Sequence, residues 1–131
     1  EIERPIVDMQ HGEQIIAVGR GFDWMHLPNR ALIIGPYDPQ WESAVATAGT
    51  IVMSNMKAGR VDEKDGALLL VGTPYKEIGA ERAIAYEKAL FLARESERVL
   101  RETNPSLMKK IKVLVGVVDM DTREFHVLES R

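Results

Sequence analysis

The stretch of this sequence with the most suggestive chemistry, HGEQIIAVGRGFDWMHLPN (residues 11–29), carries a histidine and a carboxylate two residues apart. His11 and Glu13 on one strand would share a face, so they are either a general acid–base pair or a structural hydrogen-bonded pair. The Gly-x-Gly of Gly19 and Gly21 lacks the third glycine and the helix that a dinucleotide-binding loop needs, and we interpret it as a turn.

Metal and nucleophile chemistry have little support in the sequence. The chain has no cysteine, which excludes a disulfide, a thiolate metal ligand and a cysteine nucleophile. The three histidines have no short metal-binding spacing, and no serine lies in a Gly-x-Ser-x-Gly elbow. We therefore predict no metal and no cofactor, with a metal recruited by His11 and Glu13 as the remaining alternative.

Size and charge narrow the class of protein. The chain has 131 residues, 45% of them hydrophobic and 28% charged, so we expect one globular domain over 1–131. The net charge of −3, without a long basic run, disfavours nucleic acid and anionic membranes as partners. No signal peptide or membrane span is recognisable, and we expect a cytoplasmic location. Because the sequence begins on Glu1 without a methionine, excision from a longer chain stays an open expectation.

Hydrophobic periodicity predicts the element order β, β, α, β, α, β, β. Apolar strands separated by helices favour an α/β fold: a small, mostly parallel central sheet flanked by helices, with a C-terminal antiparallel hairpin strand. Gly49 inside the first helix indicates close packing. The predicted strands are 14–20, 31–35, 66–72, 111–120 and 124–130, and the predicted helices are 41–57 and 79–103.

Polar residues gather where the predicted parallel strands end, which is where such sheets bind ligands. The segments are GPYDPQ, GTPYKEIG and DMDTR. One interpretation is a small-anion site near a helix N-terminus, and the other is a set of solvated turn residues and helix caps. The residues selected for the anion site are Asp38, Arg60, Thr73, Tyr75, Lys76 and Arg82.

Two of these segments resemble the β-class carbonic anhydrases, small parallel-sheet proteins that hold zinc at strand ends. In that family a Cys-x-Asp-x-Arg motif follows one apolar strand, and a His-x-x-Cys motif follows the next. Here Asp38 keeps the aspartate, while Pro36 and Gln40 stand where the cysteine and arginine would be. Thr73 and Lys76 replace the histidine and the second cysteine. Since these substitutes cannot bind zinc in the family's manner, the resemblance implies that zinc-hydroxide chemistry is lost.

The sequence resembles one branch more closely, the C-terminal, zinc-less domain of the carboxysome shell carbonic anhydrases. A His-x-Glu segment (11–13), an I-x-V-G-x-G-F-D stretch (16–23) and an Asn-x-Ala (29–31) carry this resemblance. It implies a β-carbonic-anhydrase-like fold, a non-catalytic role, and pairing as a homodimer or with a catalytic carbonic-anhydrase-like domain. It also implies a location in a carboxysome. The residues we assign to the pairing surface or its support are His11, Glu13, Phe22, Trp24 and Asn29.

Three functions therefore remain to be separated. The first is a non-catalytic carbonic-anhydrase-like domain with a structural or dimerisation role. The second is a module that binds a small anion such as bicarbonate, phosphate or a nucleotide. The third is an active lyase with a metal recruited at His11 and Glu13.

Overall fold

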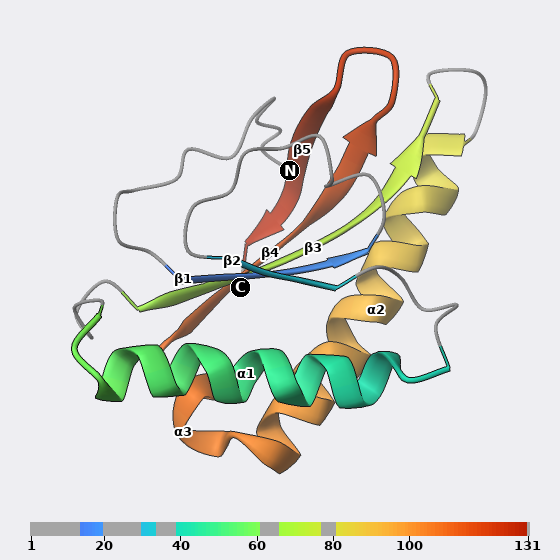
Figure 1. The fold of residues 1–131 in the computed structure, drawn as a ribbon. Helices are drawn as coiled ribbons and strands as arrows, with labels where there is room; N and C mark the ends of the chain where they lie inside the picture. Colours follow the sequence, from blue (N-terminus) through green and yellow to red (C-terminus); the bar gives the residue numbers. More distant parts are fainter. Residues whose placement is uncertain (1–13, 20–29, 34–38, 61–65, 77–80, 131) are drawn as a thin grey trace.

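The computed structural model describes residues 14–19, 30–33, 39–60, 66–76 and 81–130. In this part of the chain the strands form one five-stranded sheet, ordered β2-β1-β3-β4-β5 (Figure 1). The first four strands in that order are parallel, and β5 is antiparallel to β4. The bounds are β1 Gln14–Gly19, β2 Arg30–Ile33, β3 Ala67–Tyr75, β4 Ile111–Asp119 and β5 Glu124–Ser130.

The described helices are α1 Trp41–Lys57, α2 Glu81–Thr103 and α3 Pro105–Met108. The predicted mixed α/β architecture, with a parallel sheet and a final antiparallel strand, is confirmed. The short helix α3 was not predicted. Asn104-Pro105 ends α2 as expected, but Pro105 then occupies the first turn of a new helix, where its missing N–H costs nothing.

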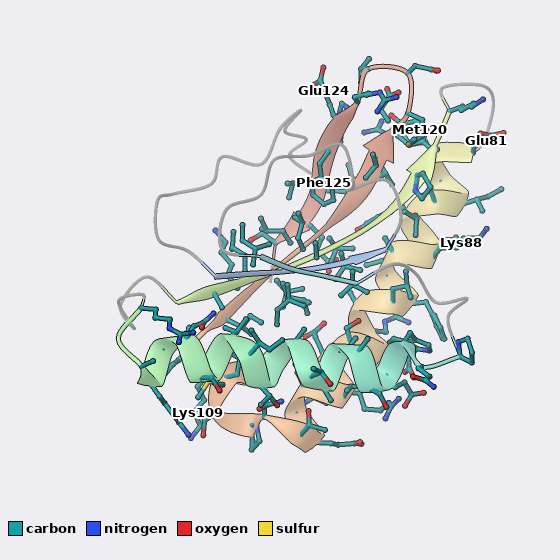
Figure 2. The ribbon with its side chains drawn as sticks, viewed as in Figure 1. Glu81, Lys88, Lys109, Met120, Glu124 and Phe125 are labelled. Atoms are coloured by element: carbon teal, nitrogen blue, oxygen red, sulfur yellow. The ribbon has the colours of Figure 1, made fainter. Side chains whose placement is uncertain are left out.

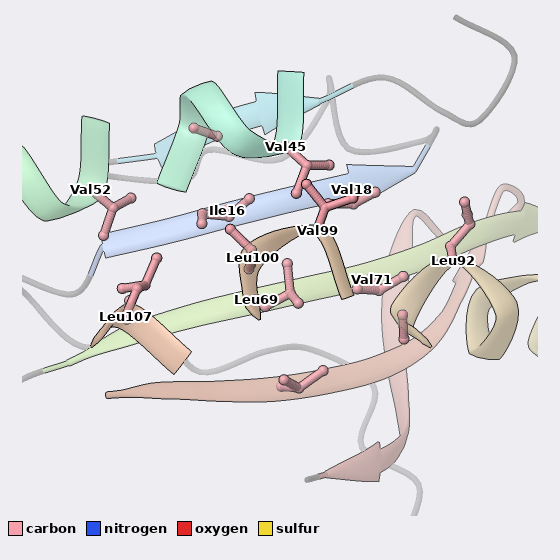
Figure 3. Close-up of a cluster of buried hydrophobic side chains, with 14 of the residues drawn as sticks. Ile16, Val18, Val45, Val52, Leu69, Val71, Leu92, Val99, Leu100 and Leu107 are labelled. Atoms are coloured by element: carbon pink, nitrogen blue, oxygen red, sulfur yellow. The ribbon is translucent and has the colours of Figure 1, made fainter. Parts of the chain in front are cut away.

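All three described helices pack on the same face of the sheet, and they bury the larger hydrophobic cluster there (Figures 1 and 3). Helix α1 places Val45, Val52 and Met56 on this face at helical spacing. Gly49 lies on the same buried stripe, and a Cβ added to it would come within 2.7 Å of Leu100 Cδ2 on α2. The close packing predicted from this glycine is therefore confirmed.

The sheet itself is apolar on both faces, as expected of a parallel sheet. Strand β3 is buried at every position from Ala67 to Thr73. Alternate residues of the strands join two clusters: Leu69 and Val71 face the helices, while Leu68 and Leu70 belong to a second cluster on the opposite face. The other members of that second cluster are Ile15, Ala17, Leu114, Val118, Phe125 and Val127.

Strand β3 is longer than predicted, and this changes the setting of two predicted site residues. We expected this strand to end at Gly72, with the polar segment after it. Instead β3 stays paired with β4 as far as Tyr75. Pro74 lies beyond the described pairing of β3 with β1, which covers Ala67 to Gly72, and it is the exposed position near the end of the strand. Thr73 and Tyr75 therefore lie in a strand.

The remaining boundaries agree closely with the prediction. Helix α1 has its expected bounds, and Gly59 just beyond it has a φ of 71°, the left-handed conformation in which helices commonly end. Strand β4 ends at Asp119, one residue earlier than expected. Parts of the predicted segments at 20, 34–35 and 79–80 lie outside the described residues.

Candidate functional site

The carboxyl ends of β3 and β4 bring Tyr75 and Asp119 together. The two residues are register partners in the parallel ladder, and both face the helices. The Tyr75 hydroxyl donates a hydrogen bond to Asp119 Oδ2 over 3.4 Å. Both side chains are buried, with 5% and 2% of their surface exposed. A buried carboxylate of this kind is the feature of the sheet end that most needs an explanation.

Asp119 is held as an anion by the turn that follows it. Its Oδ1 accepts hydrogen bonds from the backbone N–H of Asp121 at 2.9 Å and of Thr122 at 3.2 Å. Burial raises the pKa of this carboxyl, but these bonds and the charge of His126 outweigh burial and leave the pKa below its ordinary value. A carboxylate with a lowered pKa is a poor proton donor near neutral pH, so the geometry favours structure over acid catalysis here.

The turn itself joins β4 to β5, and Figure 2 labels Met120 and Glu124 at its two ends. The Met120 N–H donates to the Tyr75 carbonyl over 3.0 Å, and the Arg123 N–H donates to the Asp119 carbonyl over 2.8 Å. Arg123 takes a φ of 59° to close the loop. Asp119 thus anchors this hairpin turn, and its partner Tyr75 fixes the turn to β3.

Thr73 occupies the position where the resemblance to carbonic anhydrases would place a zinc-binding histidine. Its side chain is buried, and its hydroxyl donates a hydrogen bond to the Ala85 carbonyl in the first turns of α2. Ala85 also packs with Tyr75 in a small apolar cluster. The hydroxyl therefore ties β3 to α2, and it is already engaged within the fold.

Lys76 and Arg82 lie at this same end of the sheet, directly after β3 and in the first turn of α2. Lys76 is exposed and Arg82 is half-buried. The backbone N–H of Lys76 donates to Glu81 Oε2 over 3.2 Å, so a carboxylate of the chain itself takes this donor at the helix N-terminus. Two of the cations predicted for the anion site, Lys76 and Arg82, therefore lie at the same end of the strands. Glu81 lies there with them.

Arg60 does not lie at that end of the strands. It follows α1, and α1 returns the chain from the carboxyl ends of the parallel strands to their amino ends (Figure 1). Arg60 is exposed there, and its Nη1 donates to Asn55 Oδ1 over 3.1 Å. The topology therefore does not bring Arg60 together with Lys76 and Arg82, because they lie at opposite ends of the parallel strands.

The other predicted site residues lie outside the described residues. They are Asp38 of the anion site and the proposed pairing residues His11, Glu13, Phe22, Trp24 and Asn29. Asp119 and His126 were not among the predicted site residues, although the segment DMDTR (119–123) was expected to follow a strand. The available signal was the Asp-x-Asp-Thr spacing, in which an aspartate bonds backbone N–H groups two and three residues ahead.

The described residues at this sheet end do not fit a zinc ion. The Thr73 hydroxyl is bonded to Ala85, and Lys76 would bring a positive charge to a dication. Within the described ranges, no group of three or more His, Cys, Asp or Glu side chains is placed to hold a metal ion. None of the described helices has the length and apolar character needed to cross a membrane.

Comparisons of this chain with models of protein families, with curated proteins and with solved structures find no match.

Proposed function

We propose that this chain is a non-catalytic, carbonic-anhydrase-like domain with a structural, pairing role. The observation that carries the proposal is that the polar side chains at the carboxyl ends of β3 and β4 bond to the fold itself. Thr73 bonds to α2, and Tyr75 and Asp119 bond to each other and to the hairpin turn. In an enzyme of the family that this sequence resembles, such positions would face a metal and substrate.

The pairing partner is a second copy of this chain or a catalytic carbonic-anhydrase-like domain, and the setting is a carboxysome in the cytoplasm. These parts of the proposal rest on the resemblance of residues 11–31 to the zinc-less carboxysomal domain. A domain that has lost its chemistry and kept its fold can still contribute a surface to an assembly, since fold and site are separable.

The test of the non-catalytic role is a CO2 hydration assay in buffer with added zinc, with an active β-class carbonic anhydrase as the positive control. We expect the uncatalysed rate. A zinc-dependent acceleration would overturn the proposal. If the acceleration were lost in the double variant His11→Ala, Glu13→Ala, the lyase alternative with a recruited metal would replace it.

Binding of a small anion is the second candidate function, and the shared location of Lys76 and Arg82 is the observation that favours it. Glu81 argues against anion binding, because its carboxylate already accepts the hydrogen bond from the Lys76 backbone N–H. Thermal denaturation in bicarbonate and in phosphate, compared with chloride at equal ionic strength, distinguishes the structural role from anion binding. We expect no specific rise in melting temperature, and a rise that disappears in Lys76→Ala would support the anion module instead.

A further inference from the structure

Helix α2 leaves an apolar stripe exposed on the side that faces away from the sheet. Phe91 is 58% exposed and Ile84 is 52% exposed, and their separation by two helical turns places both on one face. Lys88 lies between them in the sequence and is also exposed, and Figure 2 labels it on α2. Large apolar side chains exposed on one face of a helix are typical of a surface that binds a partner.

The charges around Phe91 are arranged as a self-complementary set. Glu87 and Lys88 lie one turn before Phe91, and Arg94 and Glu95 lie one turn after it. Glu87 and Arg94 flank one side of the stripe, while Lys88 and Glu95 flank the other. Glu87, Lys88 and Arg94 are exposed, and none of the three makes an ion pair with another described residue. Glu95 is half-buried and pairs with Arg98 of its own helix at 3.2 Å, so the flank with Glu87 and Arg94 carries most of the charge complementarity.

We propose that this stripe binds the same stripe of a second copy of the chain, with the two α2 helices antiparallel and Phe91 at the two-fold axis. An antiparallel two-fold pair brings each flank of one helix against the same flank of the other. Glu87 then faces Arg94 of the other copy, and Lys88 faces the other copy's Glu95, so opposite charges meet on both flanks. The antiparallel arrangement of the two helix dipoles also favours this orientation.

This inference rests on the proposed pairing role and names one surface for it. It differs from the surface expected from the sequence, which lies in residues 11–29. An exposed aromatic ring surrounded by charged residues has the composition of an interface hot spot, so most of the association energy should depend on Phe91.

Sedimentation velocity of the purified chain over a range of concentrations tests the inference, with Phe91→Lys as the main variant. The introduced lysine would lie four residues from both Glu87 and Glu95, so the substitution supports the helix while it removes the apolar contact. Ile51→Lys is the matched control, since Ile51 is an apolar side chain on α1 that is 49% exposed. We expect a wild-type dimer, an unchanged dimer for Ile51→Lys, and association weaker by about tenfold or more for Phe91→Lys.

A charge exchange tests the orientation. Glu87→Arg and Arg94→Glu should each weaken the dimer, and the double variant should restore it, because only antiparallel pairing puts these two positions opposite each other. In a parallel pair Glu87 would face Lys88 and Arg94 would face Glu95, and the double variant would stay weak. That result would overturn the antiparallel arrangement.

A wild-type dimer that Phe91→Lys leaves intact would overturn the inference and leave the pairing role in place. A wild-type chain that sediments as a monomer at every concentration would also overturn it. The hydration assay would still decide the non-catalytic role in either case, so the two failures are distinguishable.

Discussion

Tyr75 and Asp119 are 44 residues apart in the chain and face each other on neighbouring parallel strands, where the tyrosine hydroxyl bonds the buried carboxylate. The same carboxylate caps the N–H groups of Asp121 and Thr122. One side chain thus joins the end of β3, the end of β4 and the hairpin turn to β5.

Removing the Asp119 carboxylate should destabilise the fold. Asp119→Ala leaves two backbone N–H groups without their acceptor, and we expect it to cost about 1–3 kcal/mol in the free energy of unfolding. Asp119→Asn keeps one carbonyl oxygen as acceptor and should cost less. Urea denaturation measures both, with Asp121→Asn as the control because Asp121 is exposed. Equal stability of Asp119→Ala and wild type would contradict the anchoring role.

The same residue should make stability depend on pH in the acid range. The folded state lowers the pKa of Asp119 from its ordinary value of 3.8, so the unfolded chain takes up this proton at a higher pH than the folded chain. The stabilisation from Asp119 is therefore complete above about pH 5 and is lost as the pH falls from 3.8 through the folded-state pKa. Urea midpoints measured against pH should fall less steeply below about pH 4 in Asp119→Asn. Identical slopes would show that Asp119 titrates normally.

The hydroxyl of Thr73 should contribute to stability and not to chemistry. Thr73→Val keeps the shape and removes the hydrogen bond to the Ala85 carbonyl, at an expected cost of about 0.5–1.5 kcal/mol. Thr73→Ser keeps the hydroxyl and serves as the matched variant. Differential scanning calorimetry should rank wild type above Thr73→Val, with no change in CO2 hydration for either variant. A change in hydration rate would place Thr73 in a reactive site.

Two glycines should respond differently to alanine. A Cβ at Gly116 would lie 2.1 Å from the His126 carbonyl oxygen, so Gly116→Ala must distort the β4–β5 pairing and should cost about 3 kcal/mol or more. At Gly49 the nearest atoms are the side-chain ends of Leu100 and Asn104, and alanine gains helix propensity of about 1 kcal/mol. We expect Gly49→Ala to stay within about 1 kcal/mol of wild type. The reverse ranking of the two melting temperatures would contradict this packing.

The elements could be predicted from the sequence because their patterns are strong and local. Continuous apolar runs such as 67–72 and the helical spacing of Val45, Val52 and Met56 need no tertiary information. The end of β3 was not predicted, because a proline lacks the N–H that a strand ladder uses and argues against a strand. Pro74 nevertheless lies in β3, beyond the described pairing with β1.

The candidate site was only partly predictable, because its residues meet through the register of the sheet. Lys76, Arg82, Thr73 and Tyr75 were assigned to one end of the fold from their place after a strand, and the structure brings them there. Asp119 was missed since its partner is fixed by the pairing of β3 with β4. The sequence does not show that α1 carries Arg60 to the amino ends of the parallel strands, away from Lys76 and Arg82.

Zinc content tests the proposed loss of the metal site most directly. The purified chain is incubated with excess zinc, passed through a desalting column and analysed by atomic absorption, with an active β-class carbonic anhydrase treated in parallel. We expect far less than one zinc ion per chain. At the two positions where the resemblance would place zinc ligands, Thr73 is bonded within the fold and Lys76 carries a positive charge. Retention of one zinc ion per chain would contradict the proposal that this domain is structural.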